Sequence, residues 1–369
     1  IIYYGLRIFS PSWFLPSTLI LCAIMSISTG SSWTTIGTIG IAFLGIGYGL
    51  GIPVGITAGA IICGAYFGDK QSPVSDSTNF AAAVAKTDLY AHTRSMVYST
   101  APSFIISLVI FTIIGARYHI ASIDESQLLQ ITSGIQQVFK LTPILLVPLI
   151  VMTVMIIKKM PAIPTMLIAI GIAVLEMFIF QHQSFSEILS YMYSGFISNT
   201  GNAAVDRLLT RGGLTSMTST VALMFMSLMM AGLMQSTNIM DSVLNKLGKA
   251  TSSQFGLIAT TLISCILLSY FAADPYLAML IPANVLGKKY DDLGLDRSVL
   301  SRTLEDGATI ICPMVPWGTN GIYCASTLGI SVLTYLPYYF MGFLTPLFSL
   351  VLAFTGIGIK KKKKETGNA

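Results

Sequence analysis

Charged residues, histidines and cysteines are all scarce in this sequence, and each shortage argues against a class of protein. Charged residues make up 10% of the 369 positions, whereas a soluble globular domain usually carries about 25%. The three histidines and five cysteines show no HExxH, CxxC or Cys/His ligand spacing, which argues against a metal centre or a disulfide framework. No glycine-rich stretch is followed by Lys-Ser or Lys-Thr, so ATP coupling within this chain is not supported.

Hydrophobic residues, in contrast, are abundant. They make up 53% of the chain, and the mean hydropathy is +0.74. Apolar stretches recur from Phe14 to Gly356, and at ~20 residues per crossing the length allows about ten membrane crossings. The sequence therefore predicts an all-α polytopic membrane protein, with the lipid bilayer as the solvent for most of its surface.

The net charge of +5 does not indicate a nucleic-acid partner, because basic residues gather at one end. Lys360 to Lys364 form a run after the last apolar stretch, which is typical of a cytoplasmic terminus close to anionic lipid. The same rule places Lys158 and Lys159 on that side. We therefore expect a multi-pass protein of the cytoplasmic membrane, with its carboxyl terminus in the cytoplasm.

Several apolar stretches are interrupted by Gly, Pro or Asp well inside hydrocarbon depth. Irregular backbone is tolerated there only where protein or a water-filled cavity satisfies its polar groups, and transporters place their binding sites at such breaks. Two halves follow one plan, because a break at 28–33 precedes Asp69 and a break at 273–275 precedes Asp306. This pattern predicts an inverted-repeat secondary transporter with discontinuous helices and re-entrant hairpins.

The expected domain organisation follows from this repeat. The segments are residues 1–140 for the first repeat with its connecting loop, 141–185 for linking transmembrane helices, 186–359 for the second repeat, and 360–369 for a lysine-rich tail. Because position 1 is Ile and not Met, we expect the native amino terminus to precede this chain and the first repeat to be truncated.

Glycines recur at regular spacing through one apolar stretch of the first half. Gly51, Gly55 and Gly59 are four residues apart, and Gly64 and Gly68 continue the series. On a helix they would form a bare stripe that allows close backbone contact. A tight hairpin would use the same residues, with Gly68 as a helix break, so the pattern leaves both structures open.

The densest group of oxygen-bearing side chains follows directly, between Gly68 and Asn79. Hard cations such as Na⁺ are bound by carboxylates, hydroxyls, amides and freed backbone carbonyls. We predict a Na⁺ site at Asp69 and Asp76, at a helix end set by Pro73. Supporting oxygen ligands are expected from Ser72, Ser75, Thr78 and Asn79. The alternative is a surface loop in which a serine merely caps the next helix.

Proton coupling requires a carboxylate that changes charge near physiological pH. Desolvation favours the protonated form of a carboxyl group, whereas a bound cation favours the ionised form. One aspartate can therefore bind either Na⁺ or H⁺, and this competition is the simplest exchange mechanism. Asp69 and Asp76 are the candidates in the first half, and their spacing of seven places them on one helix face if no break intervenes.

The second half offers a matching set of acids. Asp274 lies between two apolar stretches, where a lone acid is by default functional, although capping of a helix end beside Pro275 is the alternative. Glu305 and Asp306 are predicted to bind ions or protons in a second discontinuous element; the alternative is an ordinary helical ion pair with Arg302. The prolines predicted to break the following stretch are Pro313 and Pro316, and Thr319 and Asn320 after them are expected to be supporting oxygen ligands.

Other titratable residues are weaker candidates. The histidines His92, His119 and His182 lie in polar connections and are expected to be solvated. Glu176 is an isolated acid within an apolar stretch, for which a helix–helix hydrogen bond, a position at the lipid edge and a functional role all remain open.

These motifs closely resemble the signature of the NhaC family of sodium/proton antiporters. The matching residues are Gly68-Asp69-Lys70-x-Ser72-Pro73-x-Ser75-Asp76-x-Thr78-Asn79, Ser301-Arg302-x-Leu304-Glu305-Asp306, Pro316-Trp317 and Arg211-Gly212-Gly213-x-x-Ser216-Met217. The resemblance implies inverted repeats, helical hairpins entering from both sides and a central site. It also implies that family members begin several helices earlier, so that this chain lacks the first transmembrane helices.

Two positions depart from the family pattern. The family commonly has Gln after the acid where this chain has Asp274-Pro275, and Asn after Pro-Trp where it has Gly318. Each departure removes an amide ligand, so the substrate or coupling ion could differ from the namesake activity. The family also includes exchangers that couple malate and lactate to Na⁺ and H⁺, so the fold does not fix the substrate.

The leading hypothesis is exchange of Na⁺ for H⁺ through the intramembrane acids, with both ions as cargo and no resident cofactor. The alternative is a Na⁺/H⁺-coupled carrier of a small organic acid or amine. An intramembrane aspartyl protease would need a GxGD element, but the chain reads Tyr66-Phe67-Gly68-Asp69, so we do not expect an enzyme. Acids at separate breaks also suit an occluded site better than a channel filter. The oligomeric state stays open, with a homo-oligomer among the alternatives.

Overall fold

The computed structural model describes residues 5, 9–118, 133–158, 160, 162–202, 205–206, 209–210, 212–237 and 252–361. Within these residues the regular structure is helical, and strand-like pairing is limited to isolated bridges such as the one between Leu295 and Lys361. The prediction of an all-α chain is therefore confirmed. His119, Arg211 and the tail residues 362–369 lie outside the described residues.

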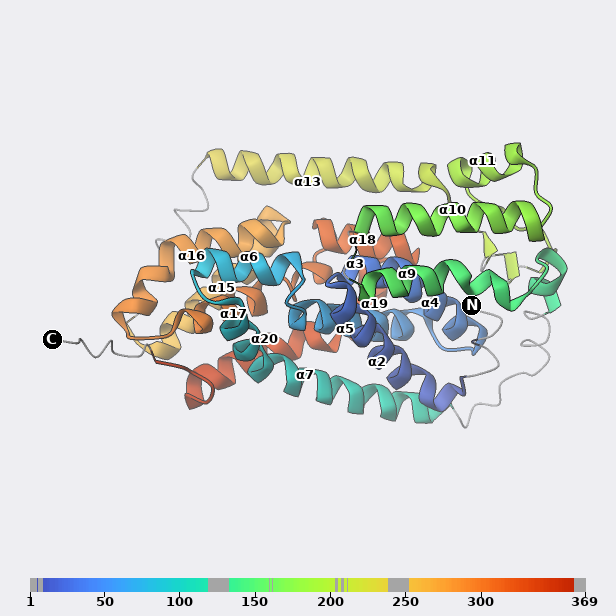
Figure 1. Cartoon of the computed structure of the whole chain (residues 1–369). Helices are drawn as coiled ribbons and strands as arrows, with labels where there is room; N and C mark the ends of the chain where they lie inside the picture. The colour runs from blue at the N-terminus through green and yellow to red at the C-terminus, as the bar shows by residue number, and fades with distance from the viewer. Residues whose placement is uncertain are drawn as a thin grey trace.

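The helices fall into three groups along the chain (Figure 1). The first group is α2 (Pro11–Thr29), α3 (Ser32–Thr35), the π-helical turn η1 (Ile36–Gly40), α4 (Ile41–Gly49), α5 (Val54–Gln71), α6 (Asp76–Ala85) and α7 (Leu89–Tyr118). The middle group is η2 (Pro143–Leu146), α9 (Val147–Ile157), α10 (Ala162–Phe180), α11 (Phe185–Ser194), η3 (Leu214–Met217) and α13 (Thr218–Ser236). The last group is α15 (Gln254–Ala272), α16 (Pro275–Asp292), α17 (Arg297–Gly307), η5 (Cys312–Met314), α18 (Thr319–Leu328), α19 (Val332–Tyr335), η6 (Leu336–Tyr338) and α20 (Phe340–Thr355).

Few of the described helices are continuous membrane spans. By length and composition α2, α7 and α15 could each cross a membrane, and a pair bent by 52°, at 332–338 and 340–355, would add a fourth span. Most other apolar stretches are divided into shorter helices, because Gly, Pro and Asp end the helical hydrogen-bond ladder. The apolar helices are those of an integral membrane protein, and the divisions between them create the breaks described next.

Four of these breaks lie near the centre of the fold. Helix α2 ends at Gly30, whose left-handed φ of 67° suits a residue without a Cβ, and the Ser31 side chain then caps α3. Helix α15 ends at Ala273, which also has a positive φ of 57°, and the Asp274 side chain caps α16. The other two breaks separate α5 from α6 and α17 from α18.

The packing of the helices brings these breaks together. Helix α2 packs on α5 and α7, and α15 packs on α16, α17 and α20. The two groups meet where α6 contacts α16 and α17, and where α7 contacts α17 and α20. In Figure 1, α13 runs along one edge of the molecule and α7 along the opposite edge. Residues from both ends of the chain therefore share the central packing.

The glycine stripe serves this packing. A Cβ atom added at Gly64 would collide with the backbone of Leu19, and one added at Gly68 would collide with the backbone of Ala23. Both contacts hold α5 against α2, so the helix-packing alternative is correct for Gly64 and Gly68. Gly51, with a positive φ of 72°, instead lies in the tight turn between α4 and α5, as the hairpin alternative expects. Helix α5 continues past Gly68 to Gln71, and the prediction that Gly68 breaks a helix is therefore wrong.

Candidate functional site

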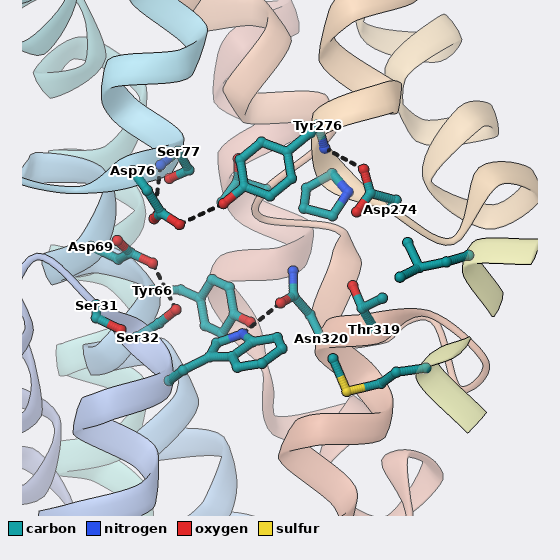
Figure 2. Close-up of a pocket in the computed structure, with 15 residues that line it drawn as sticks. Ser31, Ser32, Tyr66, Asp69, Asp76, Ser77, Asp274, Tyr276, Thr319 and Asn320 are labelled. Carbon is teal, nitrogen blue, oxygen red and sulfur yellow. Dashed lines mark hydrogen bonds between the residues drawn. The ribbon is translucent and has the colours of Figure 1, made fainter. Parts of the chain in front are cut away.

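The broken helices surround one cavity of about 340 Å³ (Figure 2). Its carboxylates are Asp69, Asp76 and Asp274. Its hydroxyl and amide groups come from Ser31, Ser32, Ser77, Thr309, Thr319 and Asn320. Its aromatic side chains are Trp33, Tyr66 and Tyr276, and its aliphatic ones are Met224, Leu228 and Pro275. Among these described lining residues there is no Lys, Arg or His, so the cavity carries negative charge only.

Asp69 is held by hydroxyl groups from two different breaks. It lies in the last turn of α5 and is 5% exposed. Ser32 donates a hydrogen bond to its Oδ2 at 2.6 Å, and Ser75 donates to its Oδ1 at 2.6 Å. Because hydrogen bonds to a charged acceptor are stronger than neutral ones, these contacts fix the orientation of the carboxylate at the cavity wall.

Asp76 is held from the other half of the chain. It is the first residue of α6, and its Oδ2 accepts a hydrogen bond from the Tyr276 hydroxyl at 2.5 Å. Its Oδ1 accepts the backbone N–H of Ser77 at 2.9 Å. The break between α5 and α6 places Asp69 and Asp76 on separate helices, so the one-face arrangement expected for an unbroken helix does not occur. Both acids nevertheless line the same cavity.

Asp274 is both a helix cap and a wall of the cavity. Its Oδ1 accepts the backbone N–H groups of Tyr276 and Leu277, each at 2.9 Å, while Pro275 occupies the first turn of α16. The capping alternative is therefore correct as a description of the local structure. The same cap orients the carboxylate toward the cavity, where Figure 2 shows it on the side opposite Asp69.

Asn320 connects α18 to the first break. Its Oδ1 accepts a hydrogen bond from the indole Nε1 of Trp33 at 2.6 Å. The Trp33 ring stacks on Tyr323, with centroids 4.1 Å apart and planes 6° apart, and the Tyr323 hydroxyl donates to the Trp33 carbonyl at 2.8 Å. Thr319 lies beside Asn320 at the start of α18 and lines the cavity.

Glu305 and Asp306 do not line the cavity but are fully buried behind it in α17. Asp306 Oδ1 lies 2.7 Å from Lys70 Nζ and accepts the Ser99 hydroxyl at 3.0 Å. Neither carboxylate oxygen of Glu305 has a hydrogen bond among the described residues, although the Ser77 hydroxyl lies close by. Asp306 therefore has a fixed counter-ion, and Glu305 does not.

Arg302 does not form the helical ion pair that its spacing allows. Its side chain is buried, and its Nη1 donates to the carbonyl oxygens of Gly358 at 3.2 Å and Ser95 at 3.4 Å. The ammonium partner of Asp306 comes instead from Lys70 on α5. The expected local pair is thus replaced by a contact between distant parts of the chain.

The remaining predicted oxygen ligands stabilise the turn between α5 and α6. Ser72 donates to the Ile27 carbonyl at 2.7 Å, and Thr78 donates to the carbonyls of Asp69 and Lys70 at 3.3 Å. Asn79 donates to the carbonyls of Pro73 and Ser75 at 2.9 and 2.7 Å. None of these three side chains lines the cavity. Pro73 lies in the turn itself, and Pro313 and Pro316 lie between α17 and α18.

One histidine and three aromatic residues differ from or extend the sequence predictions. His92 is fully buried in α7, with its Nδ1 2.7 Å from the Ser301 hydroxyl, so the prediction of a solvated loop histidine is wrong for it. Trp33, Tyr66 and Tyr276 were not predicted as site residues. Trp33 and Tyr276 each lie two residues after the residue that caps a helix at a break. This position next to a helix break is the sequence feature that could have predicted them as site residues.

The described residues contain no cluster of three His, Cys, Asp or Glu side chains that could chelate a metal together. The cavity carboxylates are instead spread around the wall. A cation within it would therefore meet individual carboxylates together with hydroxyl, amide and water oxygens, which is how hard cations are commonly bound.

The fold and cavity define an integral membrane protein whose helices are interrupted beside acidic residues that line one cavity. A family model described as the Na⁺/H⁺ antiporter family matches residues 64–357. The chain is 37% identical to the Na(+)/H(+) antiporter NhaC of Alkalihalophilus pseudofirmus, over 98% of this chain and 78% of that protein. This chain belongs to the Na⁺/H⁺ antiporter family.

Other relatives carry different names at similar identity. The chain is 36% identical to the Malate-2H(+)/Na(+)-lactate antiporter of Bacillus subtilis, over 100% of this chain and 79% of that protein. It is 35% identical to the Arginine/ornithine antiporter ArcD of Halobacterium salinarum, over 99% of this chain and 76% of that protein. The family is thus established, while overall identity does not distinguish between the cargoes that these names state.

Proposed function

We propose that this protein is a secondary active transporter that exchanges Na⁺ for H⁺ across the cell membrane. The observation that carries the proposal is the cavity lined by Asp69, Asp76 and Asp274, with no Lys, Arg or His among the lining residues that the structure describes. Family membership supports the same conclusion. The charge of the wall favours cations, and the hydroxyl and amide groups beside the acids supply the further oxygens that Na⁺ requires.

In the proposed mechanism, Na⁺ and H⁺ compete for the cavity carboxylates. When Na⁺ leaves toward one side of the membrane, a proton from that side takes its place on the carboxylate, and the reverse occurs on the other side. Ser32 and Ser75 hold Asp69, and Tyr276 holds Asp76, in positions facing the cavity. The residues thus supply a preformed site, and the ion gradients supply the driving force.

We also propose that the two halves of the chain are inverted repeats, and that the broken helix ends around the cavity rearrange during transport. The element order supports this. The first half runs from α2 through a break to α5, and through a second break to α7. The second half runs in the same order from α15 through a break to α17, and through a second break to α20. Two hydrogen bonds between the halves, Trp33–Asn320 and Tyr276–Asp76, join residues that line the cavity. Breaking and remaking such contacts would expose the site to alternate sides, with the carboxyl terminus on the cytoplasmic side.

The test of this function is Na⁺-dependent proton movement in proteoliposomes that contain the purified chain. Asp76→Asn keeps the hydrogen-bonding shape of the side chain but removes its charge, so we expect exchange to be lost while the protein stays folded. Glu187→Gln is the matched control, because Glu187 is a carboxylate in the exposed capping box of α11 and does not line the cavity. Unchanged exchange in Asp76→Asn would refute the assignment.

The alternative cargo is a small organic molecule coupled to Na⁺ and H⁺. The cavity volume of about 340 Å³ supports it, because small-molecule sites typically measure about 300–1,000 Å³. Counterflow with labelled malate, lactate and amino acids would separate the two functions. If counterflow of every labelled metabolite stays at the background level, the organic-cargo alternative is refuted and ion exchange remains the proposed function.

A further inference from the structure

One wall of the cavity has features that a bare metal ion does not need. Helix α13 contributes Met224 and Leu228 to the lining, and Pro275 adds a further apolar surface. The aromatic rings of Trp33, Tyr66 and Tyr276 also line it. A Na⁺ ion gains nothing from aliphatic contact, since it is bound through oxygen atoms. The cavity therefore combines an acidic side with an apolar and aromatic side.

We propose that this cavity binds a small organic cation, a primary alkylammonium with a short apolar tail, and that Na⁺ competes with it. The proposal rests on the proposed function in that both cations would use the same carboxylates. The ammonium group would bind at the acidic side, near Asp76 and Asp274. The tail would lie against Met224 and Leu228.

Charge selects a cation over an anion at this site. Among the described lining residues there are three carboxylates and no Lys, Arg or His. The closest buried ammonium, that of Lys70, is bound to Asp306 behind the wall and does not line the cavity. An organic acid would therefore place its carboxylate beside Asp69, Asp76 and Asp274 with no basic partner among the described lining residues, and like charges repel.

Two oxygen atoms in the wall, the Tyr66 hydroxyl and Asp274 Oδ2, are left available to a ligand. The Tyr66 hydroxyl is buried and makes no hydrogen bond among the described residues, although the thiol of Cys324 lies close to it. The Asp274 carboxylate uses Oδ1 for both helix-capping bonds, which leaves Oδ2 to accept from a ligand. An ammonium group has three donors, and the faces of Tyr and Trp attract such a cation.

The test is calorimetric titration of the purified full chain with methyl-, ethyl-, propyl- and butylammonium chloride, with and without NaCl. We expect affinity to rise along the series by about fourfold per methylene, as the burial of each CH₂ predicts, and NaCl to weaken binding competitively. Potassium butyrate, of the same length and opposite charge, should not bind. Affinity that falls with chain length, or equal binding of butyrate, would overturn the proposal.

Variants separate the two sides of the cavity. Asp274→Asn should weaken the binding of all four alkylammonium ions. Leu228→Asn should instead reduce the dependence of affinity on the length of the alkyl group, because it makes the apolar wall polar. Leu233→Asn is the control, since Leu233 is on the same helix, is 67% exposed and does not line the cavity. If affinity in Leu228→Asn still rises with the length of the alkyl group as it does in the wild type, the tail does not lie against Leu228.

Failure of the alkylammonium proposal and failure of the proposed Na⁺/H⁺ exchange give different experimental results. Na⁺-dependent proton movement without alkylammonium binding would overturn this inference and leave ion exchange in place. Alkylammonium binding without Na⁺-dependent proton movement would support the organic-cation site and refute Na⁺/H⁺ exchange.

Discussion

The Nζ atom of Lys70 lies 2.7 Å from Oδ1 of Asp306, and neither side chain is exposed. Lys70 is in the last turn of α5 and Asp306 is near the end of α17, so the ion pair joins the two halves of the chain behind the cavity. Burial of both charges is costly unless they are paired. The pair therefore fixes the relative position of α5, which carries Asp69, and α17, which carries Glu305.

Removal of one partner should be more damaging than removal of both. Lys70→Met leaves the Asp306 carboxylate buried without a counter-ion, which we expect to destabilise the fold by about 3–5 kcal/mol. Lys70→Met combined with Asp306→Asn should recover part of that loss. Thermal unfolding of the purified variants in detergent measures both effects. A double variant as unstable as the sum of its single variants would show that the two side chains are not coupled.

The hydroxyl of Tyr276 should matter for Na⁺ affinity more than for folding. Tyr276→Phe keeps the ring, which packs on Phe80 with centroids 5.1 Å apart, and removes the hydrogen bond to Asp76. Because this hydrogen bond is exposed to solvent, we expect it to contribute about 1 kcal/mol, so the Na⁺ concentration for half-maximal exchange should rise about fivefold. Tyr193→Phe, at an exposed position, is the control and should leave the value unchanged. Equal values for Tyr276→Phe and the wild type would argue against a role of this bond in the site.

The indole N–H of Trp33 should stabilise the contact between the halves. Trp33→Phe retains an aromatic ring for stacking on Tyr323 but cannot donate to Asn320. We expect slower exchange, with a folded protein, because the state that contains this contact becomes less populated when the contact is lost. The initial rate of Na⁺-driven proton movement measures this effect. An unaltered rate would mean that the bond is present in all states of the cycle or contributes to none.

Close packing of α5 on α2 gives a prediction about folding alone. Gly68→Ala would drive a Cβ into the backbone of Ala23, whereas an added Cβ at Gly171 in α10 meets no atom within 4 Å. Backbone cannot move as a flexible side chain can, so we expect Gly68→Ala to lower the yield of folded protein and Gly171→Ala to have little effect. Size-exclusion chromatography of the detergent-solubilised variants measures the folded fraction. Equal yields would contradict the close contact between these helices.

Local sequence patterns predicted the helical class and the positions of several breaks. Asp274-Pro275 and the turn around Pro73 both lie at helix ends in the structure, because proline and capping side chains act within one helical turn. Asp69 and Asp274, on different halves, were both predicted as site residues, and the structure places them around one cavity. Their binding of ions stays a prediction.

Contacts between distant segments could not be predicted from a single sequence. Lys70 and Asp306 are 236 positions apart, and no local pattern indicates that they meet. The spacing of Arg302 suggested a local ion pair, but burial of α17 on all sides directs its guanidinium to backbone carbonyls instead. Aromatic residues such as Tyr276 resemble ordinary packing residues in sequence, and only the fold shows that its hydroxyl reaches Asp76.

Binding of ²²Na⁺ to the purified chain at a series of pH values is the most direct measurement of the competition between Na⁺ and H⁺. If one proton replaces one Na⁺ at the cavity carboxylates, the half-saturating Na⁺ concentration should rise about tenfold per unit fall in pH over the competitive range. Asp69→Asn and Asp76→Asn should each abolish this binding. Na⁺ binding that does not depend on pH, or that is retained in both variants, would contradict the assignment of the cavity as the exchange site.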